Sequence, residues 1–72
     1  IEVFPNPSSG VVTIRSNGNI NGTILNALGQ EVQSFRLTEN NGYSFRIQDL
    51  PAGLYFVKDI NKDEPPVRLI RL

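Results

Sequence analysis

The chain has 72 residues, enough for one small domain near the lower size limit for a self-sufficient hydrophobic core. Hydrophobic residues make up 39% of the sequence, and seven basic and seven acidic side chains leave no net charge. This balance argues against nucleic acid or an anionic membrane surface as the main partner, because both attract clustered Lys and Arg.

No apolar run approaches the roughly 20 residues that a membrane-spanning helix needs. Cys is absent, which excludes a disulfide framework, and no signal peptide is visible at the start. The chain begins without Met, directly in a strand-like segment. We therefore expect residues 1–72 to form a single domain taken from a longer protein.

Short runs rich in β-branched and aromatic residues recur along the chain, separated by Gly, Asn and Pro. Alternation supports strands: Val12 and Ile14 share one face of their run, and Tyr43, Phe45 and Ile47 share one face of theirs. No segment sustains the apolar spacing of an amphipathic helix. The predicted strands cover residues 1–4, 11–15, 22–27, 30–36, 43–48, 54–59 and 67–71.

Seven short strands with brief connections predict an all-β fold, a small immunoglobulin-like antiparallel sandwich. Residues 54–57 are all apolar, so both faces of this strand are expected to be covered. Turn signals such as Asn17-Gly18 and Asn40-Asn41-Gly42 fall between the strands.

The turn before residues 54–57 contains Pro51, which restricts its own φ, and Gly53, which tolerates φ values that other residues resist. Leu50-Pro51 followed by Tyr55 fits a tyrosine corner, in which the phenol bonds nearby backbone. The alternative is a half-buried tyrosine in an ordinary hairpin.

Metal binding has one candidate segment. Asp59, Asn61 and Asp63 match the opening of a calcium loop, but Glu64 stands where that loop needs Gly, and Ile70 stands where it needs a bidentate Glu. A solvated loop is therefore favoured over a dedicated metal site, with a weak calcium contact left open.

The residues available for catalysis are few. Without His or Cys the usual base and thiolate nucleophile are missing, and the carboxylates fall mostly in loops or polar strand positions. A domain of this size also has little room for a substrate cleft. We predict a non-enzyme without cofactors. The serines, none with a neighbouring base, are Ser8, Ser9, Ser16, Ser34 and Ser44.

Three blocks of the sequence resemble the C-terminal sorting domains of cargo proteins of the type IX (Por) secretion system in Gram-negative bacteria. They are Val-Phe-Pro-Asn-Pro-Ser-Ser-Gly at residues 3–10, Leu-Gly-Gln at residues 28–30 and Leu-Pro-Ala-Gly-Leu-Tyr at residues 50–55. Together these ordered blocks span nearly the whole chain. The family pattern falls on Pro5, Asn6, Pro7, Gly10, Leu28, Gly29, Gln30, Leu50, Pro51, Gly53 and Tyr55.

The resemblance implies a secretion signal at the C-terminus of a cargo protein, read by the type IX machinery in the periplasm. It implies passage of the cargo across the outer membrane to the cell surface or the medium. It further implies that a sortase-like peptidase removes the domain, at a site upstream of this chain, and attaches the cargo to a surface lipopolysaccharide.

The last predicted strand is the candidate recognition element. As a sheet edge it offers backbone groups for β-augmentation by a receptor, and its side chains alternate between apolar and cationic. Family members usually end in Lys-x-x-x-Lys, whereas Arg-x-x-Arg here is one residue tighter. The alternative is that the cations only prevent aggregation. The recognition residues expected are Arg68, Leu69, Ile70, Arg71 and Leu72.

Other functions compete with this hypothesis. An accessory carbohydrate- or protein-binding sandwich of a secreted hydrolase is one, and a fibronectin-like spacer is another. Sugar binding favours exposed aromatic rings, whereas Tyr43 and Phe45 lie on the expected core face and Trp is absent. Pro5-Asn6-Pro7 either stiffens the first turn or contacts a secretion component. A dimer formed through an edge strand is also possible for so small a sheet.

Overall fold

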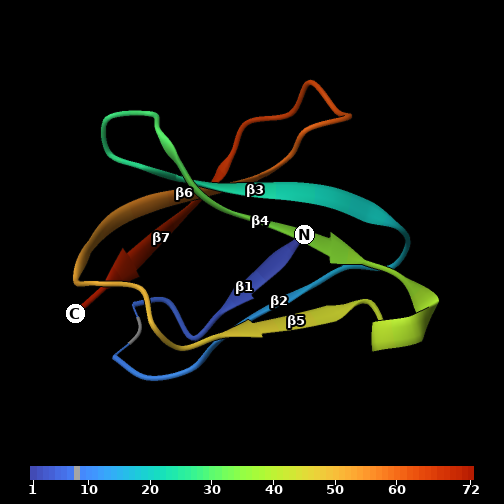
Figure 1. Ribbon diagram of the computed structural model, residues 1–72, viewed down its shortest axis with the longest axis horizontal. Coiled ribbons are helices and arrows are strands. Elements are labelled where there is room, and N and C mark those ends of the chain that lie inside the picture. Colours follow the sequence, from blue (N-terminus) through green and yellow to red (C-terminus); the bar gives the residue numbers. More distant parts are fainter. Residues whose placement is uncertain (8) are drawn as a thin grey trace.

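The computed structural model describes residues 1–7 and 9–72, so Ser8 lies outside the described residues. Two antiparallel sheets face each other as a sandwich (Figure 1). The first sheet has the order β1-β2-β5, formed by Glu2–Phe4, Val12–Arg15 and Ser44–Ile47. The second has the order β4-β3-β6-β7, formed by Glu31–Leu37, Ile20–Asn26, Gly53–Asp59 and Val67–Arg71. The predicted all-β sandwich is confirmed.

The strands lie close to the predicted ranges, with two informative differences. β3 begins at Ile20 rather than at residue 22, because Ile20 is buried and pairs with Leu37 of β4. The Asn40-Asn41-Gly42 segment does not close a hairpin: it leads from β4 in one sheet to β5 in the other through the short 3₁₀ helix η1 (Glu39–Asn41). Gly42 ends that helix at φ 67°, a left-handed conformation that glycine accepts without steric cost.

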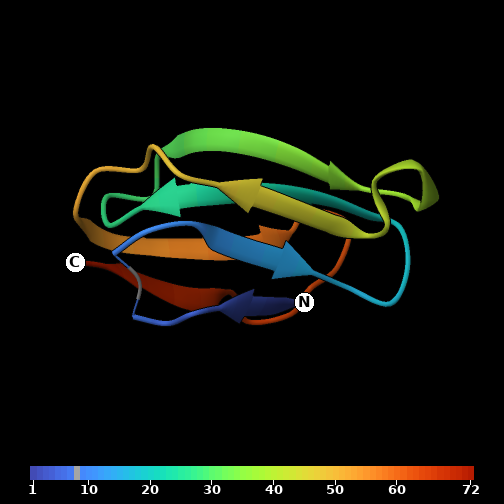
Figure 2. The same cartoon turned by 90° about the horizontal axis from the view of Figure 1, so that it is seen from below.

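The two sheets approach each other along both sides of the sandwich. Seen from below, β4 lies beside β5 on one side, and β7 lies beside β1 on the other (Figure 2). The molecule measures 30 × 24 × 16 Å along its principal axes. The first and last strands therefore lie side by side at the seam between β1 and β7, which brings residues distant in sequence into contact.

The core lies between the sheets and is built from alternate residues of each strand. Val12 and Ile14 face inward, as predicted, and Phe35 of β4 stacks on Phe45 of β5 across the gap, with ring centroids 5.6 Å apart. Side chains with no exposed surface anchor both sheets. These are Val12, Ile14, Ile24, Leu37, Val57 and Leu69.

The expectation that residues 54–57 are covered on both faces is wrong. Tyr55 and Val57 point into the core, whereas Leu54 is 37% exposed and Phe56 is half-buried. The reason is that each sheet of a sandwich packs on one face only, so an uninterrupted apolar run must present alternate residues outward.

Candidate functional site

The candidate site is the C-terminal strand and the residues around it. β7 is an edge strand that pairs with β6 inside its sheet, as the sequence predicted. Its side chains alternate: Leu69 and Arg71 are buried, and Arg68 and Ile70 are exposed. Leu72, just beyond the strand, is also exposed. The structure thus divides the five predicted recognition residues into three on the surface and two in the interior.

Arg71 is 8% exposed, and its guanidinium binds backbone carbonyls of two connecting segments. It donates to Gly10 between β1 and β2, and to Gln48 and Leu50 between β5 and β6, the last two at 3.0 and 3.2 Å. Hydrogen bonds from a charged donor are stronger than neutral ones. Arg71 therefore fastens both connections to the end of β7. Arg71 lies two residues after Leu69 and therefore on the same face of β7, and the structure shows that this face is the inner one.

The side-chain amide of Asn6 binds the free edge of β7 through both its nitrogen and its oxygen. Nδ2 donates to the carbonyl of Arg68 at 2.6 Å, and Oδ1 accepts the amide N–H of Ile70 at 3.0 Å. Residues i and i+2 of a strand turn their backbone groups to the same edge, so Asn6 occupies the place that a neighbouring strand would take. We call this pair of bonds the Asn6 bracket.

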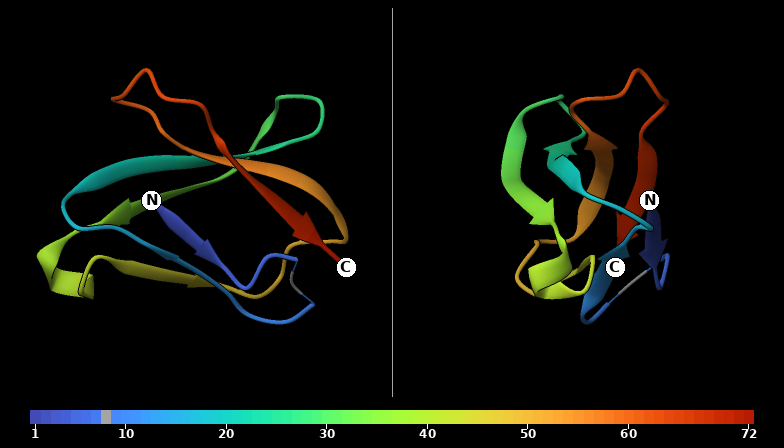
Figure 3. Two further views of the ribbon diagram at one scale, coloured as in Figure 1. Left: turned by 180° about the vertical axis from the view of Figure 1, so that it is seen from behind. Right: turned by 90° about the vertical axis from the view of Figure 1, so that its right-hand side faces the viewer.

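The Asn6 bracket lies at the seam between the first and the last strand. Figure 3 shows the segment after β1 running close to the C-terminal end of β7. Pro5 and Pro7, on either side of Asn6, have no backbone N–H to offer an incoming strand. Sequence reasoning missed the bracket because Asn6 and Arg68 are 62 positions apart in the chain.

The Leu-Gly-Gln block forms the turn between β3 and β4. The Asn26 side-chain oxygen accepts the backbone N–H groups of Leu28 and Gln30 at 2.9 and 3.0 Å. Gly29 takes φ 82°, a left-handed conformation. Leu28 is 85% exposed as a result, displayed at the tip of the hairpin.

The Leu-Pro-x-Gly-x-Tyr block forms a tyrosine corner. The Tyr55 hydroxyl donates to the carbonyl of Pro51, four residues earlier, at 2.8 Å. Leu50 packs against the core, and Gly53 turns the chain into β6 at φ 149°. Of the two alternatives left by the sequence, the corner is confirmed.

The segment that resembled a calcium loop uses its first carboxylate in a turn. Asp59 is buried, and its Oδ1 accepts the N–H of Asn61 at 2.9 Å. Within residues 1–7 and 9–72, no three side chains of the kinds His, Cys, Asp and Glu gather around a common point. Asp59 thus stabilises the β6–β7 connection.

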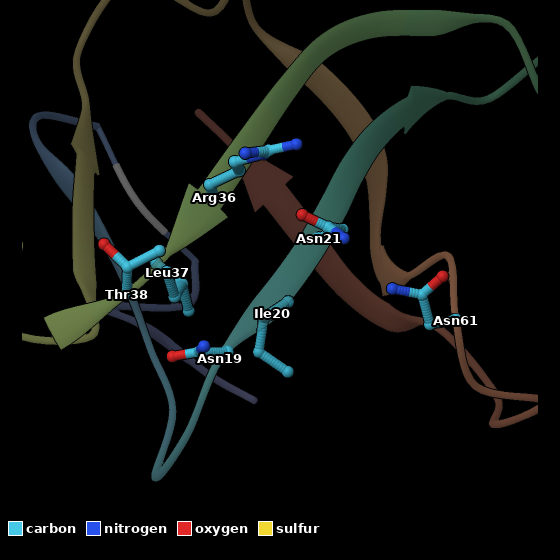
Figure 4. Close-up of a pocket in the computed structure, with 7 residues that line it drawn as sticks. All are labelled: Asn19, Ile20, Asn21, Arg36, Leu37, Thr38 and Asn61. Carbon is cyan, nitrogen blue, oxygen red and sulfur yellow. The ribbon is translucent and has the colours of Figure 1, made fainter.

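A shallow hollow of about 300 Å³ lies where β3 begins, β4 ends and the loop after β6 passes (Figure 4). Asn21, Arg36 and Asn61 border it. The side chains drawn in Figure 4 spread in different directions instead of converging on one point. The hollow also lies on a different part of the second sheet from the exposed residues of β7.

The fold and the site together define a small antiparallel β-sandwich domain. Its last strand lies at the edge of a sheet and exposes the side chains of Arg68 and Ile70. The family model described as the secretion system C-terminal sorting domain matches residues 2–68. The chain therefore belongs to this family, the sorting domains of type IX secretion, as the resemblance predicted. No curated protein and no solved structure matches the chain.

Membership of the family identifies a type IX secretion sorting signal. Such a signal implies an N-terminal cargo, the type IX machinery as partner, and export to the cell surface or the extracellular space. In the part of the chain that the structure covers, no helix is long and apolar enough to span a bilayer.

Proposed function

We propose that this domain directs a cargo protein joined to its N-terminal side out of the periplasm and across the outer membrane through the type IX machinery. The observation that carries this proposal is the family match over residues 2–68. The sandwich supports it, because a folded domain of this size can present a recognition surface without chemistry of its own.

After export, a sortase-like peptidase removes the domain upstream of Ile1 and joins the cargo to a surface lipopolysaccharide. In this proposal the domain acts as a signal and not as a catalyst. In this proposal the peptidase recognises the linker that joins the cargo to the domain.

Within the domain, β7 supplies the recognition residues. Arg68, Ile70 and Leu72 are exposed and contact the machinery, whereas Leu69 and Arg71 hold the strand in position from inside. The family positions in the turns have the same indirect role. Asn6, Gly29 and Tyr55 shape the three connections through the bonds and dihedral angles described above.

An export assay tests the proposal. Residues 1–72 are fused behind a Sec signal, a fluorescent protein and a flexible linker, and expressed in a bacterium that has a type IX system. We expect fluorescence at the cell surface or in the medium, and its loss in a strain without the machinery. Retention in the periplasm of a folded fusion would contradict the proposal.

Removal of the domain is tested in the same strains. Immunoblots with separate tags on the cargo and on the domain distinguish the intact fusion from the cleaved cargo. The expected result is a cargo without the domain, shifted to higher mass by lipopolysaccharide, in cells that retain the peptidase. Surface cargo that still carries the domain in those cells would contradict this step while leaving export intact.

A further inference from the structure

We propose that the domain docks on a protein of the secretion machinery through the outer face of β6 and β7, and that the docking partner offers an apolar centre surrounded by acidic side chains. This inference rests on the proposed function and names the surface that serves it. We call this surface the β6–β7 face. It consists of Leu25, Leu54, Phe56, Lys58, Arg68 and Ile70.

The register of the strands makes the apolar residues of the β6–β7 face continuous. Leu54 lies directly opposite Ile70, and Phe56 lies between Leu25 on β3 and Arg68 on β7. Side chains opposite each other on one face of a sheet are about 5 Å apart at Cβ and touch. Leu54 and Ile70 are 37% and 38% exposed, and Phe56 is half-buried.

The outer face of the other sheet is composed differently. There Arg15 forms an ion pair with Glu2 at 3.2 Å and also lies over the Phe4 ring, 5.0 Å from its centroid. Thr13, Ser44 and Arg46 also lie on this face, where Phe4 is an apolar residue, 37% exposed and beneath the Arg15 guanidinium. A sandwich ordinarily covers itself with such polar residues, so an apolar group on one outer face indicates an interaction surface.

Charge identifies the partner's chemistry. Lys58 and Arg68 flank the apolar centre, and neither forms an ion pair with any residue that the structure describes. Arg68 lies opposite Phe56, and Lys58 lies opposite Thr23, whose hydroxyl donates to the Glu31 carboxylate at 2.9 Å. Glu31 is thus the acidic residue nearest to this group, on the β3–β4 side, and Arg68 on the β7 side has no carboxylate directly across from it. On a chain with no net charge, two cations that form no ion pair beside an apolar group favour an acidic partner surface, and Arg68 carries most of this argument.

The Asn6 bracket is the reason to choose the face over the edge of β7. A partner strand would have to bond the Arg68 carbonyl and the Ile70 amide, and both are already bound to Asn6. The side chains of Arg68 and Ile70 project at right angles to those bonds and stay accessible. Docking on the face therefore requires no rearrangement of the domain, whereas β-augmentation requires displacement of Asn6.

The first experiment compares substitutions on the face with matched substitutions elsewhere, in the export assay described above. Ile70→Ser and Arg68→Glu change the β6–β7 face. Val32→Ser, at a valine of β4 that is 43% exposed, and Arg46→Glu, at an exposed arginine of β5, are their controls. Circular dichroism and urea unfolding of each purified domain verify that all four variants fold.

We expect exported fluorescence to fall on the order of tenfold for Ile70→Ser and for Arg68→Glu, as for central residues of an interface. The two controls should be exported like the parent, and Arg68→Lys should recover most of the loss. Export of both face variants at the parental level would overturn the inference. Failure of the parent itself to be exported would instead contradict the proposed function.

Two further outcomes identify other occupants. If the edge of β7 is the recognised element, Asn6→Ala raises export and Ile70→Ser has no effect, which overturns docking on the face. If a second copy covers the face, sedimentation shows a dimer that Ile70→Ser dissociates while export stays unchanged, which also overturns it. A monomeric parent together with loss of export in the face variants supports the inference.

Discussion

Arg71 shows how a charged residue at a strand end becomes structural. Its aliphatic stem follows Leu69 into the sandwich, and its guanidinium reaches three backbone carbonyls in two connections. Carbonyls in loops near a core have no strand partner, so an interior cation with several donors is well suited to satisfy them. Arg71, which the sequence suggested as one of two cationic recognition residues, therefore stabilises the interior of the fold.

We expect Arg71→Met to lower the free energy of unfolding by about 2–4 kcal/mol, because it keeps the apolar stem and leaves three partly buried carbonyl interactions without their charged donor. Urea denaturation followed by circular dichroism measures the change. Arg68→Met, at an exposed site on the same strand, is the matched control and should alter the value by less than about 0.5 kcal/mol. Equal effects of the two substitutions would refute the interior role of Arg71.

At the scale of elements, the pairing of β3 with β4 depends on a glycine under an aromatic ring. Gly22 lies opposite Phe35, and a Cβ at position 22 would clash with the ring of Phe35. Phe35 is 5% exposed and stacks on Phe45, so the ring has little freedom to move away. Glycine is required here by space and not by its dihedral angles.

Gly22→Ala should therefore destabilise the domain by about 1–3 kcal/mol through overpacking. Gly18→Ala is the control, because a Cβ there meets no atom within 4 Å. Replacing Phe35 by Leu in the Gly22→Ala background should recover part of the loss, and a double-mutant cycle in urea measures this coupling. Additive effects of the two substitutions would show that the ring does not oppose the methyl group.

The Asn6 bracket gives a second prediction at this scale. In Asn6→Ala the Ile70 amide loses its acceptor, so its hydrogen exchange should speed up roughly tenfold. The Leu69 amide faces β6 instead and serves as the internal control. Exchange measured by NMR that leaves Ile70 as protected as before would contradict the bracket.

At the scale of the whole molecule, the domain is small enough that each strand contributes a large share of its stability. A chain of this size retains about 3–5 kcal/mol of net stability. β7 supplies the fully buried Leu69, the Arg71 guanidinium and the edge to which Asn6 binds. The residues that we propose for recognition therefore belong to a strand on which folding also depends.

We expect deletion of residues 68–72 to unfold the domain rather than only to remove its recognition residues. Loss of the circular dichroism signal of the sheet and of dispersed amide resonances would show this. Such a truncation would not be exported because it does not fold. Loss of export would then say nothing about recognition, so single substitutions at the surface are the informative variants. A truncated domain that keeps its dispersed spectrum would contradict the coupling.

Much of the fold could be predicted because the alternation of side chains between the two faces of a strand depends only on neighbouring residues in the chain. Alternation placed Val12 and Ile14 on one face, which is the interior one, and the spacing of Pro51 and Tyr55 indicated the corner that the structure contains. Leu69, which was expected to contact a receptor, is fully buried. Residues 54–57 also alternate between the inner and the outer face of their strand. Because all four are apolar, the sequence did not show this alternation. A run of one polarity carries no periodic signal, so its two faces cannot be assigned without the sheet.

The sequence by itself determined the family, the strand positions and the turn chemistry, because each depends on residues close together in the chain. Tertiary structure alone decided three other matters: that Arg71 is interior, that Asn6 binds β7, and that Leu54, Phe56 and Ile70 form one exposed group. These depend on which strands become neighbours and on the order in which the sheets place them. The physical reason is that hydrogen bonding and burial act through space, and the seam between β1 and β7 joins residues more than sixty positions apart.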